Sequence, residues 1–147
     1  MRETLFNWLG QTLYGKRCLD LFAGSGALGF EAASREAAQV VMVETNRAVY
    51  RALQDNAKKL ELGNVALQCA DGLKFAAHES MAFDVIFLDP PFQSDYLPKL
   101  LPKLADKLTA NGVIYVESGN PFDAGAEWQV LKQGKAGAVH HQLIRRA

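Results

Sequence analysis

The sequence contains no apolar run near the ~18 residues that a membrane-spanning helix needs, and no internal repeat or low-complexity tract. Its first residues include Arg2 and Glu3 and lack the apolar core of a signal peptide, so we expect no secretory signal. It also lacks an excess of either charge, because 16 Lys and Arg residues balance 16 Asp and Glu residues. Balanced charge excludes a general attraction to nucleic acid, so any contact with RNA or DNA must use a local patch.

Cysteine and histidine are scarce. The two cysteines, Cys18 and Cys69, fall on segments that we predict to be core strands, and we expect buried free thiols rather than a disulfide. Free thiols suit a reducing cytosol, which predicts a cytoplasmic protein. His140 and His141 have no Cys or His partner at metal-ligand spacing, so we expect no metal.

The length and composition suit one domain, residues 1–147, because the 147 residues are 49% hydrophobic and can build a proper core. Two runs in the tail, 128–132 and 138–144, indicate an antiparallel hairpin that closes one edge of a sheet. The remaining pattern alternates expected strands at 17–22, 39–43, 65–69, 83–88 and 112–116 with expected helices at 2–13, from 27, 49–60 and 97–108. This order predicts an α/β fold, a Rossmann-like, doubly wound sheet that the C-terminal hairpin makes mixed.

The stretch from Leu19 to Ala32 indicates a buried strand, a glycine turn and a helix. Glycines at 24 and 26 let the backbone turn sharply and approach a ligand, and the following helix presents its free N–H groups there. An adenosine-containing cofactor would lie on this turn, at the carboxyl ends of the strands. Since the spacing Gly24-x-Gly26-x-x-Gly29 also fits the dinucleotide fingerprint, the motif alone does not choose between NAD and S-adenosylmethionine.

Three acids stand where such a cofactor would be recognised. Asp20 lies inside an apolar strand and needs a partner, which the cationic amino group of a cofactor would supply. Glu44 ends the second strand, about twenty residues after the glycine turn, where a ribose-binding carboxylate is expected. Asp71 follows the third strand, where it can contact the adenine amino group, cap the next helix, or do both.

The most apolar strand, expected at the centre of the sheet, runs into Asp89-Pro90-Pro91-Phe92. The two prolines remove two N–H donors and stop the strand, which leaves carbonyls free to point into a cleft. Glu117 follows the next strand, and the pattern fits a place in the cleft and a place on the surface equally well.

This outline resembles the class I S-adenosylmethionine-dependent methyltransferases, in which Asp-Pro-Pro-Phe is similar to the catalytic motif of enzymes that methylate exocyclic amino groups. Four segments, residues 2–9, 20–32, 89–92 and 114–118, together resemble the RsmD family, bacterial methyltransferases of guanine N2 in small-subunit ribosomal RNA. The resemblance covers essentially the whole chain in the same order. Two departures are Asn46, where relatives often have Asp, and the start at Met1, because family members usually begin several tens of residues earlier with a basic segment.

The resemblance implies S-adenosyl-L-methionine as cofactor, S-adenosyl-L-homocysteine as product, and a monomer that acts on small-subunit ribosomal RNA, free or in the assembled subunit. It implies the catalytic residues Asp89, Pro90, Pro91 and Phe92. The implied cofactor-binding residues are Asp20, Phe22, Ala23, Gly24, Ser25, Gly26, Gly29, Glu44, Thr45, Asp71, Gly72 and Asp89. Three alternatives stay open: a nicotinamide-dependent oxidoreductase, an adenine-N6 methyltransferase of DNA, and a cofactor- or RNA-binding module without activity.

Overall fold

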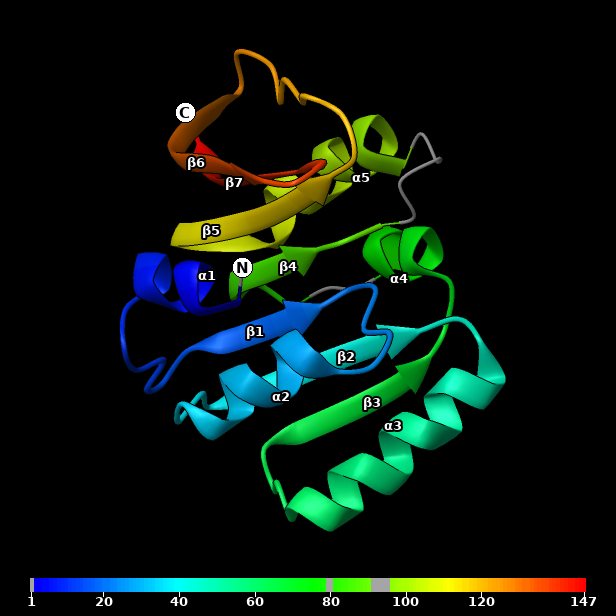
Figure 1. Cartoon of the computed structure of the whole chain (residues 1–147). Coiled ribbons are helices and arrows are strands. Elements are labelled where there is room, and N and C mark those ends of the chain that lie inside the picture. Colours follow the sequence, from blue (N-terminus) through cyan, green and yellow to red (C-terminus); the bar gives the residue numbers. More distant parts are fainter. Residues whose placement is uncertain (1, 79–80, 91–95) are drawn as a thin grey trace.

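A seven-stranded sheet with the order β3-β2-β1-β4-β5-β7-β6 forms the centre of the molecule (Figure 1). The computed structural model describes residues 2–78, 81–90 and 96–147. The strands are β1 Arg17–Asp20, β2 Gln39–Glu44, β3 Val65–Cys69, β4 Phe83–Leu88, β5 Leu108–Ser118, β6 Trp128–Ala136 and β7 Val139–Arg146. Strands β1 to β5 pair in parallel, whereas β7 is antiparallel to both β5 and β6. The expected doubly wound, mixed sheet with β4 at its centre and a hairpin at one edge is therefore confirmed.

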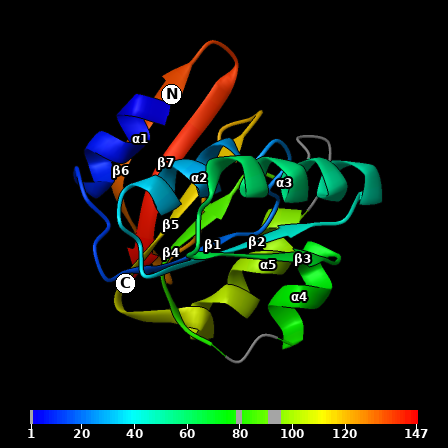
Figure 2. The ribbon, with the colours of Figure 1, turned by 90° about the horizontal axis from the view of Figure 1, so that it is seen from below.

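Helices cover both faces of the sheet, as a doubly wound fold requires (Figure 2). On one face lie α1 Arg2–Leu9, α2 Ala27–Ser34 and α3 Arg47–Leu60. On the other lie α4 Gly72–His78 and α5 Tyr96–Leu104, which continues as the 3₁₀ turn η1 Ala105–Lys107. Among the described residues, no helix is long and apolar enough to cross a membrane.

Each face of the sheet has its own apolar core. Phe6 of α1 and Leu53 of α3 pack with Phe87 of β4 on the first face. Leu100 of α5 packs with Ile86 of β4 on the second face. Burial on both sides explains why β4 is apolar throughout rather than alternating.

The first helix is shorter than its periodicity predicts. It ends at Leu9, because Gly10 takes a φ of 103° and donates its N–H to the Phe6 carbonyl, 3.0 Å away. Leu13, expected inside the helix, is fully buried but lies beyond its end. Cys18 is buried as expected, whereas Cys69 is exposed at the end of the edge strand β3.

The cap of α3 is confirmed at one end and corrected at the other. Asn46 Oδ1 accepts the N–H of Val49 at 3.0 Å, as expected for an N-cap. The helix ends at Leu60, because the next residue, Glu61, adopts the left-handed conformation with a φ of 54°; Gly63 does not end it. Leu60, expected in the apolar stripe, is 54% exposed because it lies on this last turn.

Gly29 lets α2 approach the sheet closely. A Cβ placed on Gly29 would lie 2.7 Å from Sδ of Met42, a residue of β2 with no exposed surface. The third glycine of the turn motif therefore packs a helix against a strand, as in dinucleotide-binding folds.

Gly29→Ala is expected to lower the free energy of unfolding by about 1–3 kcal/mol, because the fully buried side chain of Met42 would have to shift to admit the methyl group. Gly63→Ala is the matched control, since no heavy atom lies within 4 Å of its Cβ position. Urea unfolding of both variants measures the difference. Equal midpoints for the two would contradict this account of the packing.

Candidate functional site

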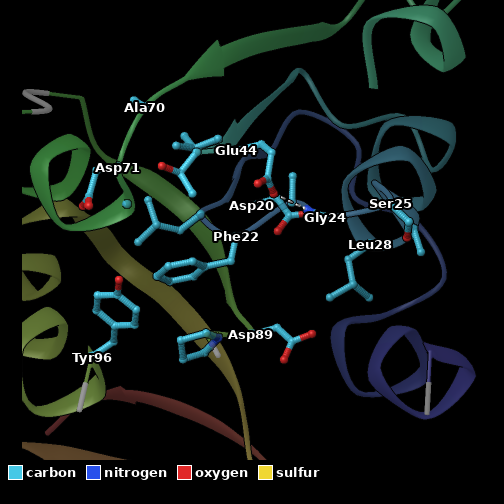
Figure 3. Close-up of a pocket in the computed structure, with 17 residues that line it drawn as sticks. Asp20, Phe22, Gly24, Ser25, Leu28, Glu44, Ala70, Asp71, Asp89 and Tyr96 are labelled. Carbon is cyan, nitrogen blue, oxygen red and sulfur yellow. Dashed lines mark hydrogen bonds between the residues drawn. The ribbon is translucent and has the colours of Figure 1, made fainter. Parts of the chain in front are cut away.

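A cleft of about 520 Å³ opens at the carboxyl ends of β1, β2, β3 and β4 (Figure 3). This is the edge at which ligands bind in doubly wound sheets. The described residues that line it are Asp20, Leu21, Phe22, Ala23, Gly24, Ser25, Ala27, Leu28, Val43, Glu44, Thr45, Ala70, Asp71, Gly72, Asp89, Pro90 and Tyr96.

The turn between β1 and α2 forms one side of the cleft. Gly24 and Gly26 have φ angles of 55° and 87°, in the left-handed region that glycine enters at little cost. Gly26 and Gly29, both expected at the cofactor, do not line the cleft. A Cβ on Gly26 would lie 2.4 Å from the ring of Phe30, so this glycine allows the turn to fold back on its own helix.

Glu44 ties the end of β2 to this turn. Its Oε1 accepts the N–H of Gly24 at 3.0 Å, and its Oε2 accepts the N–H of Asn46 at 2.9 Å. Figure 3 shows Glu44 and Asp20 gathered beside Gly24. Because an ionised carboxylate oxygen can accept more than one hydrogen bond, Glu44 keeps acceptor capacity toward the cleft.

Asp20 is a buried acid, with 2% of its surface exposed. The sequence suggests a cofactor as its partner, but the backbone supplies one, since Asp20 Oδ2 accepts the N–H of Gly29 at 3.1 Å. Burial and, to a smaller extent, the charges of Asp89 and Glu44 nevertheless raise the pKa of Asp20 to about 7, although hydrogen bonds from the backbone of Gly29 and Phe22 oppose the rise. These backbone contacts therefore do not fully compensate the buried charge.

Asp71 is a helix cap that also lines the cleft. Its Oδ1 accepts the N–H groups of Leu73 at 2.8 Å and Lys74 at 3.2 Å, at the start of α4. The capping role is therefore confirmed, and its place in the cleft leaves the second oxygen available for a ligand.

Asp89 and Pro90 follow β4 and line the same cleft as the glycine turn. Pro91 and Phe92, the other two expected catalytic residues, lie outside the described residues. Burial, together with the nearby carboxylate of Glu117, raises the pKa of Asp89 to about 6. Glu117, whose place the sequence left open, thus stands beside the expected catalytic acid.

Sequence reasoning did not identify Tyr96 or Leu28 as lining residues. The Tyr96 ring lies 5.5 Å from the Phe22 ring, centroid to centroid, and the two aromatics form an apolar wall of the cleft. Tyr96 begins α5, and no spacing motif links it to the glycine turn, so the sequence carries no signal for this contact.

The histidines of β7, His140 and His141, do not belong to a group of described side chains that could bind a metal ion. Within residues 2–78, 81–90 and 96–147, no group of three His, Cys, Asp or Glu side chains could hold a metal ion. His141 is buried and stacks on Trp8 of α1, with ring centroids 5.0 Å apart.

Comparison with known proteins gives consistent similarities. The family described as "Conserved hypothetical protein 95" matches residues 1–145. The chain is 39% identical over 152 residues to Ribosomal RNA small subunit methyltransferase D of Escherichia coli (strain K12), covering 99% of this chain and 76% of that protein. It is 36% identical to the Haemophilus influenzae protein of that name, covering 99% of this chain and 79% of that one. The solved structure of yhhF from Escherichia coli superimposes with a TM-score of 0.91 at 38% identity, over 99% of this chain and 84% of that one.

Asp20 is expected to make the stability of the ligand-free protein depend on pH. Its folded-state pKa of about 7 exceeds the ordinary 3.8, so the folded state keeps a proton that the unfolded state has lost between these values. The free energy of unfolding should then fall as pH rises from about 4 to 7, by on the order of 1 kcal/mol per pH unit.

Urea unfolding at several pH values measures this slope, with Asp20→Asn as the control. Asn has no proton to lose but keeps an oxygen for the Gly29 N–H. The variant should therefore show a flatter profile over the same range. Parallel profiles for the two proteins would refute the assignment to Asp20.

Proposed function

The chain belongs to the family that includes the ribosomal RNA small subunit methyltransferase D proteins, and we propose that it methylates the exocyclic N2 amine of a guanine in small-subunit ribosomal RNA. This membership confirms the resemblance found in the sequence. The observation that carries the proposal is the shared cleft, because Asp89 and Pro90 face the same space as the glycine turn and Glu44. A methyl donor bound at the glycine turn and a guanine amine bound at Asp89 would then lie next to each other in the cleft.

S-adenosylmethionine fits the side chains that line the cleft. Asp20 is a buried acid with an incompletely compensated charge, which suits the cationic amino group of the donor. Glu44 has acceptor capacity for the ribose hydroxyls. The free oxygen of Asp71 suits the adenine amino group, and the rings of Phe22 and Tyr96 suit the apolar face of the base.

The remaining expected contacts follow from the lining of the cleft. Ala23, Gly24, Ser25, Thr45 and Gly72 line it and would contact the donor through their backbone or short side chains. Gly26 and Gly29 would contribute indirectly, by shaping the turn and setting α2 against β2.

The chemistry requires a better nucleophile than a free guanine amine, whose lone pair is delocalised into the ring. The Asp89 carboxylate and the Pro90 carbonyl can accept hydrogen bonds from the two N–H groups of this amine. These bonds would direct the nitrogen lone pair toward the methyl group of the donor. The donor supplies a methyl group on a positively charged sulfur, which is a good leaving group. Positioning therefore carries much of the catalysis. Phe92 would stack on the base.

The RNA partner follows from the family, and the charge of the chain limits how it is held. With 16 basic and 16 acidic residues, attraction to RNA must come from a local surface. We propose that the chain acts as a monomer in the cytoplasm, on free small-subunit RNA or on the assembled subunit.

The alternatives make different use of the same residues. A nicotinamide enzyme would share the glycine turn but leave Asp89 and Pro90 without a role. A DNA adenine-N6 methyltransferase would use the same acid on a different base. A binding module without activity would bind the donor and transfer nothing.

Transfer of a labelled methyl group from S-adenosylmethionine tests the function directly. Small-subunit ribosomal RNA, both free and assembled, and duplex DNA serve as substrates, and the labelled nucleoside is identified after digestion. We expect N2-methylguanosine from RNA. N6-methyl-2′-deoxyadenosine from DNA would support the adenine-N6 methyltransferase, and donor binding without transfer would support the binding module.

Asp89→Asn is expected to keep measurable transfer, whereas Asp89→Ala should lose much more. Asn keeps an acceptor oxygen for the amine, and loss of a charged acceptor costs about 1.5–3 kcal/mol, or on the order of ten- to a hundredfold in rate. Single-turnover rates measure the effect, with donor affinity as the control that should hardly change. Equal rates for Asn and Ala would rule out the acceptor role.

A further inference from the structure

A second carboxylate stands next to Asp89 at the edge of the sheet. Strands β4 and β5 pair with Leu88 opposite Val116, so the next residues, Asp89 and Glu117, are level across the two strands. The carboxylate of Glu117 is near enough to Asp89 to raise its pKa. The pattern of acids in the sequence does not reveal this pair, because the two residues are 28 positions apart and only the register joins them.

Tyr115 holds Glu117 in place. The Tyr115 hydroxyl donates to Glu117 Oε1 at 2.6 Å, from the residue two positions earlier on the same face of β5. The Tyr115 ring is 1% exposed and packs in the core around Phe87, so the hydroxyl has a fixed position. Burial and the neighbouring Glu117 raise the pKa of Tyr115 far above its ordinary value, so it remains a donor at any physiological pH.

Two ionised carboxylates are acceptors only, and a hydrogen bond between them needs a proton. Like charges at such a distance disfavour double ionisation, as in other carboxyl pairs that share a proton. Tyr115 donates to Oε1 of Glu117, and a carboxyl group has a second oxygen through which it can share a proton. The arrangement is therefore built to hold one proton between two carboxyl groups.

We propose that Glu117 is a positioning residue that acts through Asp89, and that the pair takes up the proton which the guanine amine loses after methyl transfer. This inference rests on the proposed function. The amine nitrogen forms its bond to the methyl carbon while the carbon–sulfur bond breaks and its electron pair stays on sulfur. The nitrogen then carries one proton too many, which it gives to Asp89. The proton is shared with Glu117 and leaves through the open cleft to water.

The groups around the pair come from three strands. Asp20 of β1 interacts with Asp89 through its charge, and Tyr115 of β5 is the donor described above. His141 of β7 lies opposite Glu117 in the register, and burial lowers its pKa, which favours the neutral imidazole. Asp20 and Glu117 both act on Asp89 as like charges, and proton uptake reduces the negative charge of the pair.

Glu117→Gln tests the pairing by removing the charge while keeping the shape. The amide oxygen can still accept from Tyr115, so the local structure should persist. We expect the acid limb of the pH profile of kcat/KM to have its midpoint near pH 6 in the parent and about one pH unit lower in the variant, because Asp89 loses its like-charged neighbour. A purely structural role for Glu117 would lower the rate at every pH and leave the midpoint unchanged.

Tyr115→Phe is the matched control. It removes the donor to Glu117 but leaves both carboxylates, so its rate should fall while its midpoint stays at or above that of the parent. A midpoint lowered as much as in Glu117→Gln would overturn the pairing, because the shift would then follow from disturbed packing.

A second readout does not depend on activity. Carbon-13 NMR of labelled aspartate carboxyl groups follows Asp89 directly, with Asp89→Asn to assign its signal. In the parent protein we expect the Asp89 signal to titrate in two steps, and in Glu117→Gln in one step at lower pH. A single unshifted titration in both proteins would overturn the proposal. If the parent methylates no RNA, the proposed function fails, and this titration still decides the pairing.

Discussion

Two carboxylates hold the glycine turn in place, and the geometry of the cleft depends on them. Asp20 at the end of β1 accepts the N–H of Gly29, and Glu44 at the end of β2 accepts the N–H of Gly24. These bonds fix the turn at both of its ends, because Gly24 begins it and Gly29 lies in the first turns of α2. The same acids line the space in front of the turn. The groups that shape the site are thus also groups that can recognise a ligand.

Because these acids lie close together, their negative charges repel one another. Asp20, Glu44 and Asp89 face one cleft, and burial together with their mutual repulsion raises the pKa of Asp20 to about 7. Such clusters of perturbed acids are typical of functional sites. A positively charged group beside Asp20 would favour the ionised form of this acid, so the cleft suits a ligand that carries an ammonium group.

The sequence predicted the elements whose signals are local. Strands β1 to β4 are short apolar runs, the turn has its glycines, and the cap at Asn46 needs only its own side chain. Features that depend on distant contacts were missed or wrong. The partner of Asp20 is a backbone N–H nine residues later, and the place of Glu117 depends on the register between β4 and β5. Cys69 is exposed because β3 is an edge strand, a position that local pattern does not encode.

The central claim is that the cleft carries its acids for a cationic, ribose-containing ligand, and proton release on binding tests it most directly. Calorimetry near pH 7, in buffers with different ionisation enthalpies, counts the protons released by S-adenosylhomocysteine, which has the ammonium group, and by adenosine, which lacks it. We predict that binding of S-adenosylhomocysteine makes Asp20 release a fraction of a proton and that binding of adenosine releases none. The same proton count for both ligands would contradict it.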